Sequence, residues 1–128
     1  MPYYFNKTMQ MPFPDAVAKV TDGLAAEGFG VLSDIDVKAT MKRKLDVEFH
    51  NYRILGACNP PFAYRALQIE DKIGTLMPCN VIVQERTPGE VEVAAVNPMV
   101  SMQAVNKPEL REVAEEVTAR LRRVIDRL

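Results

Sequence analysis

Apolar and polar residues alternate in several short stretches of the chain, a pattern typical of strands with one buried face. β-branched residues concentrate in these stretches, most clearly at Val81, Ile82 and Val83. Turn residues at 87–89 separate the last two stretches, so we expect those two to form an antiparallel hairpin. The strands predicted in this way cover residues 3–9, 29–37, 49–58, 76–85 and 91–96.

Elsewhere the apolar residues recur every three or four positions, as expected for helices with one buried face. The clearest helix is the last, because its apolar stripe runs along its full length, and we expect this stripe to pack on the sheet. The stripe consists of Leu110, Val113, Val117, Leu121 and Val124. The predicted helices cover residues 14–27, 37–45, 59–72 and 106–128.

Capping residues support these helix boundaries. Gly28 stands where the first helix needs a residue that adopts the left-handed conformation. Asp36 and Asn59 precede the next two helices and are predicted N-caps. Asn106 and Glu109 have the spacing of a capping box at the start of the last helix.

The order strand, helix, strand, helix, strand, helix, strand, strand, helix predicts an α+β fold. We expect a mixed, mostly antiparallel sheet of about five strands, with the helices packed mainly on one face. No internal repeat, linker or charge block divides the chain, so residues 1–128 are predicted to form a single domain.

Composition narrows the possible functions. Hydrophobic residues make up 48% of the 128 residues and charged residues 26%, which excludes a disordered chain. The net charge of −1 provides no field to hold a polyanion, so we expect no nucleic-acid partner. No apolar run approaches the length of a membrane span, and the first residues lack a signal-peptide pattern. A soluble, cytoplasmic protein with no membrane partner is expected.

Cys58 and Cys79 are the strongest candidates for chemistry. Each lies in a short polar context, Ala-Cys-Asn-Pro and Pro-Cys-Asn-Val, at the end or start of a predicted strand. If those strands are neighbours, the thiols could approach each other on one side of the sheet. They could then act as a redox pair, a persulfide carrier, or soft ligands for a metal or haem iron. The competing interpretation is that both cysteines are buried structural residues, and we expect no structural disulfide.

A set of polar residues forms the second candidate, because its members could line one cleft where strands end and helices begin. Such a cleft could bind a small anion or supply an acid and a base, although Asp36 and Asn59 also suit capping roles. The set consists of Asp34, Asp36, Lys38, Tyr52, Arg53, Asn59, Arg65 and Asn80. His50, the one histidine, is predicted at the surface, and no metal ligands are assigned. The sequence contains no motif that names a cofactor or a catalytic residue, so both stay unknown.

Residues spread over nearly the whole chain carry a resemblance to a known family. They include Gly28, Phe29, Leu45, the run Gly-Ala-Cys-Asn-Pro at 56–60 and the run Pro-Cys-Asn-Val at 78–81. With these residues the chain resembles domain-of-unknown-function family 302. The resemblance implies a small α/β domain with helices on a largely antiparallel sheet, and it implies a homodimer. It implies no established activity.

Two functions are therefore weighed. The first is a dimeric binding or accessory module that holds a small ligand or a partner. The second is a thiol-based redox, sulfur-carrier or metal- or haem-binding protein that uses Cys58 and Cys79. For the homodimer we expect contact along an unpaired edge formed by the strand at 91–96. The predicted ligand-binding residues are Asp36, Lys38, Tyr52, Cys58, Asn59, Cys79 and Asn80.

Overall fold

A computed structural model describes residues 2–128, and its centre is a five-stranded sheet with the strand order β1-β5-β4-β3-β2. All four pairs of neighbouring strands are antiparallel, which confirms the predicted α+β class and leaves no parallel pair within the described residues. The strands are β1 (Tyr4–Gln10), β2 (Gly30–Asp36), β3 (Asn51–Cys58), β4 (Cys79–Thr87) and β5 (Glu90–Val96).

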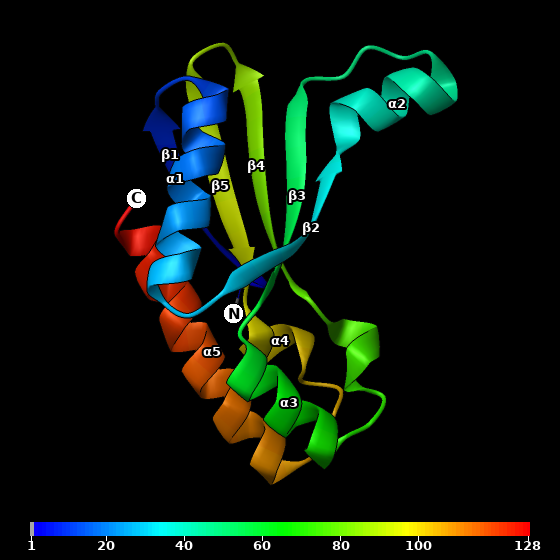
Figure 1. Ribbon diagram of the computed structural model, residues 1–128, viewed down its shortest axis with the longest axis vertical. Coiled ribbons are helices and arrows are strands. Elements are labelled where there is room, and N and C mark those ends of the chain that lie inside the picture. Colours follow the sequence, from blue (N-terminus) through cyan, green and yellow to red (C-terminus); the bar gives the residue numbers. More distant parts are fainter. Residues whose placement is uncertain (1) are drawn as a thin grey trace.

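The helices are arranged unevenly around this sheet (Figure 1). α1 and α5 lie side by side over one face, α3 and α4 gather at one end of the strands, and α2 stands away from the body. The helix predicted at 59–72 ends at Ile69 and is followed by the short 3-10 helix η1. The helices are α1 (Phe13–Ala26), α2 (Val37–Leu45), α3 (Pro60–Ile69), η1 (Ile73–Leu76), α4 (Pro98–Ser101) and α5 (Pro108–Asp126).

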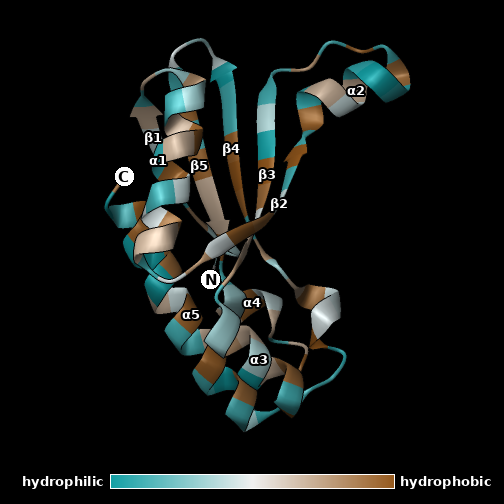
Figure 2. Ribbon diagram, in the orientation of Figure 1, coloured by the Kyte–Doolittle hydropathy of each residue, from teal (hydrophilic) through white to brown (hydrophobic). Residues whose placement is uncertain are grey.

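The hydrophobic core lies between the sheet and the helices α1 and α5. We call this side of the sheet the covered face. Its strand residues include Leu55, Val81, Val83, Val91 and Val93, each at most 1% exposed. The whole predicted stripe of α5 is buried in this core, which confirms the amphipathic helix. Only part of the stripe packs on the sheet, because the first half of α5 lies against α3 and α4 instead (Figure 1). In Figure 2 the apolar residues of α5 appear as brown bands that alternate with teal, hydrophilic ones.

Two of the predicted caps form and two do not. Gly28 has a φ of 87°, and the Asp36 side chain accepts a hydrogen bond of 2.9 Å from the Ala39 amide. Asn59 makes no capping bond, because its amide nitrogen instead donates to the Glu27 carbonyl over 3.0 Å. The capping box at the start of α5 was wrong too, since this helix begins at Pro108 without a side-chain cap.

The strand β2 differs from its prediction in which residues share a face. The simple alternation predicted Val31 and Ile35 on one side. A register shift between Val31 and Ser33 adds one residue, so Val31 pairs with Ala57 on the covered face. Ile35 pairs with Ile54 on the other side and is 48% exposed. The bulge therefore moves an isoleucine to the uncovered face of the sheet.

The strand β5 corrects the expected dimer edge. It pairs with β1 on one side and β4 on the other, so its backbone groups are already hydrogen-bonded along both edges. Val91 and Val93 are fully buried under the helices. The edges of the sheet are β1 and β2, and contact through a free edge at 91–96 was a wrong prediction.

Candidate functional site

A pocket opens where β3 ends and β4 begins, beneath α3 and α5. β3 leads directly into α3, and the chain returns through η1 to start β4 beside it. The cavity has a volume of about 230 Å³. Its lining comes from six segments of the chain: Phe29, Leu32, Ala57, Cys58, Asn59, Phe62, Ala63, Ala66, Met77, Pro78, Cys79, Met102, Val113, Ala114 and Val117.

The lining is almost entirely apolar. Asn59 brings the one carboxamide among these residues, and none of them carries a charge. The Asn59 side chain is 7% exposed and its nitrogen is bound to the Glu27 carbonyl, which fixes its orientation. Two aromatic rings and two methionines make up much of the remaining wall. Such a surface favours an uncharged, largely apolar ligand, since a charged one would lose its hydration without compensation.

Cys58 and Cys79 both line this pocket, and both are free. Their strands are neighbours, as predicted, and the register places Cys79 opposite Ala57. Cys58 is one position further along β3 and belongs to the alternate set of residues, so the predicted placement of both thiols on one side of the sheet was wrong. Burial raises the pKa of the Cys58 thiol. Burial, together with the charge of Cys58, raises the pKa of Cys79 to about 11. Both groups are therefore protonated thiols near neutral pH, a form that is a poor nucleophile and a poor metal ligand.

The predicted ligand-binding residues fall into three places. Cys58, Asn59 and Cys79 line the pocket. Tyr52 and Asn80 lie on the opposite face of the sheet, along a shallow hollow of about 630 Å³. The last two, Asp36 and Lys38, belong to the start of α2, where Asp36 caps the helix. Only the first three residues can contact one small molecule bound in the pocket.

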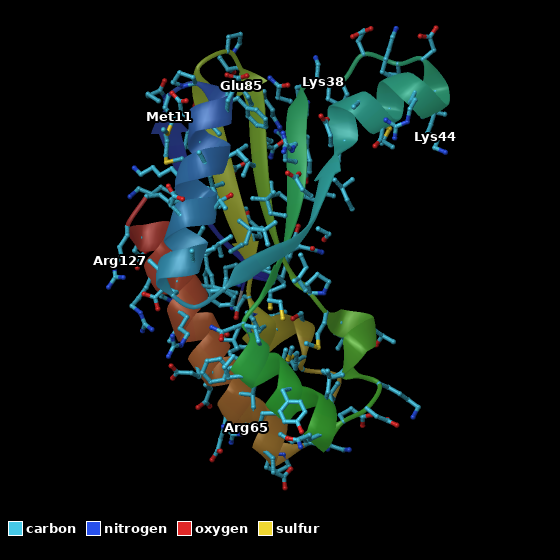
Figure 3. All side chains as sticks on the ribbon, viewed as in Figure 1. Met11, Lys38, Lys44, Arg65, Glu85 and Arg127 are labelled. Carbon is cyan, nitrogen blue, oxygen red and sulfur yellow. The ribbon has the colours of Figure 1, made fainter. Side chains whose placement is uncertain are left out.

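The predicted polar cleft does not form. Asp34 accepts a hydrogen bond of 2.7 Å from Arg53, so these two charges pair with each other. Arg65 pairs with Glu112 of α5 over 3.0 Å. Figure 3 shows Lys38 and Arg65 at opposite ends of the molecule. The prediction failed because it grouped residues by their position where strands end and helices begin. In an antiparallel sheet, consecutive strands run in opposite directions, so their C-terminal ends lie at opposite ends of the sheet.

A chain of hydrogen bonds on the uncovered face was not predicted. A ring nitrogen of His50 lies 2.9 Å from the Gln84 side-chain oxygen, and Gln84 donates to Glu92 over 2.8 Å. Asn6 donates to the other oxygen of Glu92, also over 2.8 Å. His50 is thus a partly buried member of this network. The contacts of His50 with Gln84 and of Asn6 with Glu92 join residues 34 and 86 positions apart, so no local pattern could have indicated them. Among residues 2–128 no cluster of three or more His, Cys, Asp or Glu side chains could hold a metal.

A second unpredicted cluster surrounds Glu27 at the end of α1. Its carboxylate receives hydrogen bonds of 2.9 Å from Arg123 and from Arg127, and Arg120 bonds the Glu27 carbonyl over 3.1 Å. The hydrogen bond from Arg123, with the charges of the arginines, holds the pKa of Glu27 below its usual value. The arginines late in α5 therefore join α5 to α1, in addition to complementing the helix dipole.

Comparison with known proteins identifies relatives but no activity. A search among curated proteins found no match. A solved structure, described as the crystal structure of an uncharacterized conserved protein DUF302 from Bacillus stearothermophilus, superimposes with a TM-score of 0.90. The two sequences are 26% identical, and the match covers 99% of this chain and 98% of the other.

Two further findings complete the description. No helix within residues 2–128 combines the length and the apolar character that a membrane span requires. The family model of the domain of unknown function DUF302 matches residues 5–128. With nearly all of its length matched, the chain belongs to the DUF302 family.

Proposed function

We propose that this protein is a binding module that holds a small, uncharged, largely apolar molecule in the pocket beneath α3 and α5. The observation that carries the proposal is the pocket itself, a cavity of about 230 Å³ with an apolar lining that a single carboxamide interrupts. Folding would close such a space with side chains if it served packing alone, because an apolar cavity costs stability. A retained cavity therefore supports a ligand.

The size and chemistry of the pocket define the ligand class. Its volume lies below the roughly 300–1,000 Å³ of pockets for drug-sized ligands, so the ligand has few atoms. Phe29 and Phe62 offer ring surfaces, and Met77 and Met102 offer flexible, polarizable ones. A flat, apolar molecule with at most one hydrogen-bonding group, placed against Asn59, would match this surface.

Thiol chemistry is the alternative function. The placement of Cys58 and Cys79 in one pocket supports it, because a bound molecule would contact both thiols. Their raised pKa values oppose it, since a thiol that titrates far above neutral pH reacts slowly. Under the binding proposal the cysteines serve as walls, and replacing either by alanine leaves binding largely intact.

The homodimer is also part of the proposal, as is a single domain that works in the cytoplasm without nucleic acid. The near-neutral net charge supports the absence of a nucleic-acid partner, and the two free cysteines support the cytoplasm. The dimer cannot use β5 as its contact edge, because β1 and β4 already flank that strand.

Naphthalene, a small flat hydrocarbon, is a suitable probe of the pocket. We expect its addition to shift the NMR signals of the Met77 and Met102 methyl groups, since ring currents act on nearby nuclei. The Met41 methyl group on the distant α2 serves as the internal control and should not move. Binding should persist in Cys58→Ala and Cys79→Ala.

A filled pocket provides the matched variant. Ala63 lines the cavity, so Ala63→Trp should block the response to naphthalene, whereas Tyr64→Trp should preserve it because Tyr64 is 67% exposed on the same helix. A response that survives Ala63→Trp, or no response of Met77 and Met102 in the unmodified protein, would contradict the proposal. The thiol alternative would be favoured if both cysteine variants lost the response and the thiols of the unmodified protein were rapidly alkylated.

A further inference from the structure

Among residues 2–128 no helix packs on the face of the sheet opposite α1 and α5 (Figure 1), and we call this the open face. Strand pairing places Ile35 opposite Ile54, Ile54 opposite Ile82, and Ile82 opposite Ala94. Directly paired residues share a face, so these four side chains form one line across four strands. We call this line the aliphatic row. Ile35, at its end, is 48% exposed.

Polar residues border the aliphatic row. Tyr52 pairs with Gln84, and Gln84 with Glu92, so the hydrogen-bonded chain described above runs parallel to the row. Gln84 is only 7% exposed even though no helix covers it. The one acid and one base that line the hollow on this face are Glu92 and Arg86. A face with balanced charge favours neither a strongly acidic nor a strongly basic partner.

The helix α2 is a second part of the molecule without cover. None of its nine residues is buried, and it follows β2 away from the body (Figure 1). Leu45 is 66% exposed and Val47 is 47% exposed. Isolated helices of this length are marginally stable in water, and most helices gain their stability by packing an apolar side. We call residues 37–47 the arm.

We infer that a second copy of this chain covers the open face, with the two aliphatic rows in contact and each arm packed against the other copy. This inference rests on the proposed function only for the existence of the dimer. A copy of the same chain fits because a line of isoleucines is complementary to another such line across a two-fold axis. Two sheets packed in this way would lie about 10 Å apart.

The available area agrees with a stable dimer that includes the arms. Five strands of about seven residues present a face of roughly 500–550 Å² in projection. A standard interface buries about 800 Å² of accessible surface on each partner. The corrugated sheet provides much of that area, and the arm provides an apolar surface to extend it. Contact with the second copy would therefore bury the apolar residues of the arm, which remain unburied within a single chain.

Light scattering at micromolar concentration tests the inference on the full chain. The unmodified protein should have twice the mass of one 14.4 kDa chain. Ile82→Asp, at the centre of the aliphatic row, should weaken the dimer by about hundredfold or more because it buries an unpaired carboxylate. Leu45→Asp should weaken it through the arm, and its exposed position protects the fold of the single chain. Leu67→Asp is the matched control on α3, where Leu67 is 43% exposed, and should leave the dimer intact.

If Ile82→Asp fails to fold by circular dichroism, Ile35→Asp replaces it, because Ile35 lies in the same row on an exposed edge strand. A monomeric unmodified protein would overturn both the dimer and this interface. A dimer that persists in the Ile35 or Ile82 variant and in Leu45→Asp would overturn the interface alone. The naphthalene response reports the pocket in the monomeric variants as well, so failure of the binding proposal is separately visible.

Discussion

The two faces of the sheet are built from alternate residues of the same strands, yet helices of the chain cover only one of them. On the covered face, Val81 and Val83 of β4 are fully buried beneath helices of the same chain. On the open face, Ile82 lies between them in sequence and remains only partly buried. The covered face is completed by helices of the same chain, whereas the open face carries the aliphatic row, which no helix within residues 2–128 covers.

The comparison separates two roles within one small fold. The covered side contains the core and, at its end, the apolar pocket that we propose as the ligand site. The open side and the arm supply the proposed contact between copies. Because the two sides share strands but not side chains, substitutions on one side should leave the other largely unaffected.

The largest expected effect is on the covered face. Leu121→Ala removes a fully buried side chain from α5 and should cost about 2–5 kcal/mol in the free energy of unfolding. Chemical denaturation measures this change. The counterpart on the open face is Ile54→Ala in the monomeric Leu45→Asp background, with an expected cost of about 1 kcal/mol because Ile54 is only half-buried. Equal costs at the two positions would remove the distinction between the faces.

Alkaline pH should weaken the pocket end of the covered side. The native fold holds the pKa of Cys79 at about 11 against an ordinary value of 9.0, so the protonated thiol is favoured in the folded state. This contribution is present below about pH 9 and is lost as the pH rises toward 11. The full pKa shift corresponds to about 2–3 kcal/mol in the free energy of unfolding. In Cys79→Ala this loss of stability at alkaline pH should be absent. Identical curves for the variant and the unmodified protein above pH 9 would place this thiol in contact with water.

A smaller effect is expected where α5 joins α1. Glu27→Gln should cost about 1–2 kcal/mol at neutral pH, because the charge-assisted bonds from Arg123 and Arg127 are weakened. The pKa of Glu27 is lowered by folding, so its contribution is present above the ordinary value of 4.5 and lost as the pH falls below it. The variant should therefore lose less stability in acid, as followed by thermal unfolding.

Glu116→Gln is the control for this substitution, since Glu116 is an exposed acid that pairs with Arg120 one turn along the same helix and makes no contact with α1. Its cost should stay near 0.3–0.5 kcal/mol. If it matched Glu27→Gln, the buried position of Glu27 would have no special importance.

The sequence predicted the elements well where the signal is periodic. The stripe of α5 and the alternation in β4 survive in the structure, because each reflects burial of one side of a regular element. The prediction for β2 failed at Leu32, where a bulge inserts one residue and exchanges the faces of all that follow. A bulge is set by the partner strand, and its one sign in residues 29–37 is Ser33, a polar residue on the otherwise apolar side of the alternation.

The candidate site was predicted only in part. Cys58, Asn59 and Cys79, which the sequence singled out, all line one pocket, since all three flank the adjacent strand ends. The apolar walls were not identified, because Phe62 and Met102 resemble ordinary core residues in a sequence. The partners of Glu27 lie more than 90 positions away, a distance at which charge alone suggests no pairing.

The most direct test of the two-face account is hydroxyl-radical footprinting at concentrations above and below the dissociation of the dimer. Ile54 and Ile82 on the open face and Leu45 on the arm should be protected in the dimer and become reactive on dilution. Val83 should stay unreactive in both conditions, and the exposed Tyr64 should react in both. The account would be contradicted if Ile82 and Leu45 reacted equally at all concentrations while protection developed on another surface.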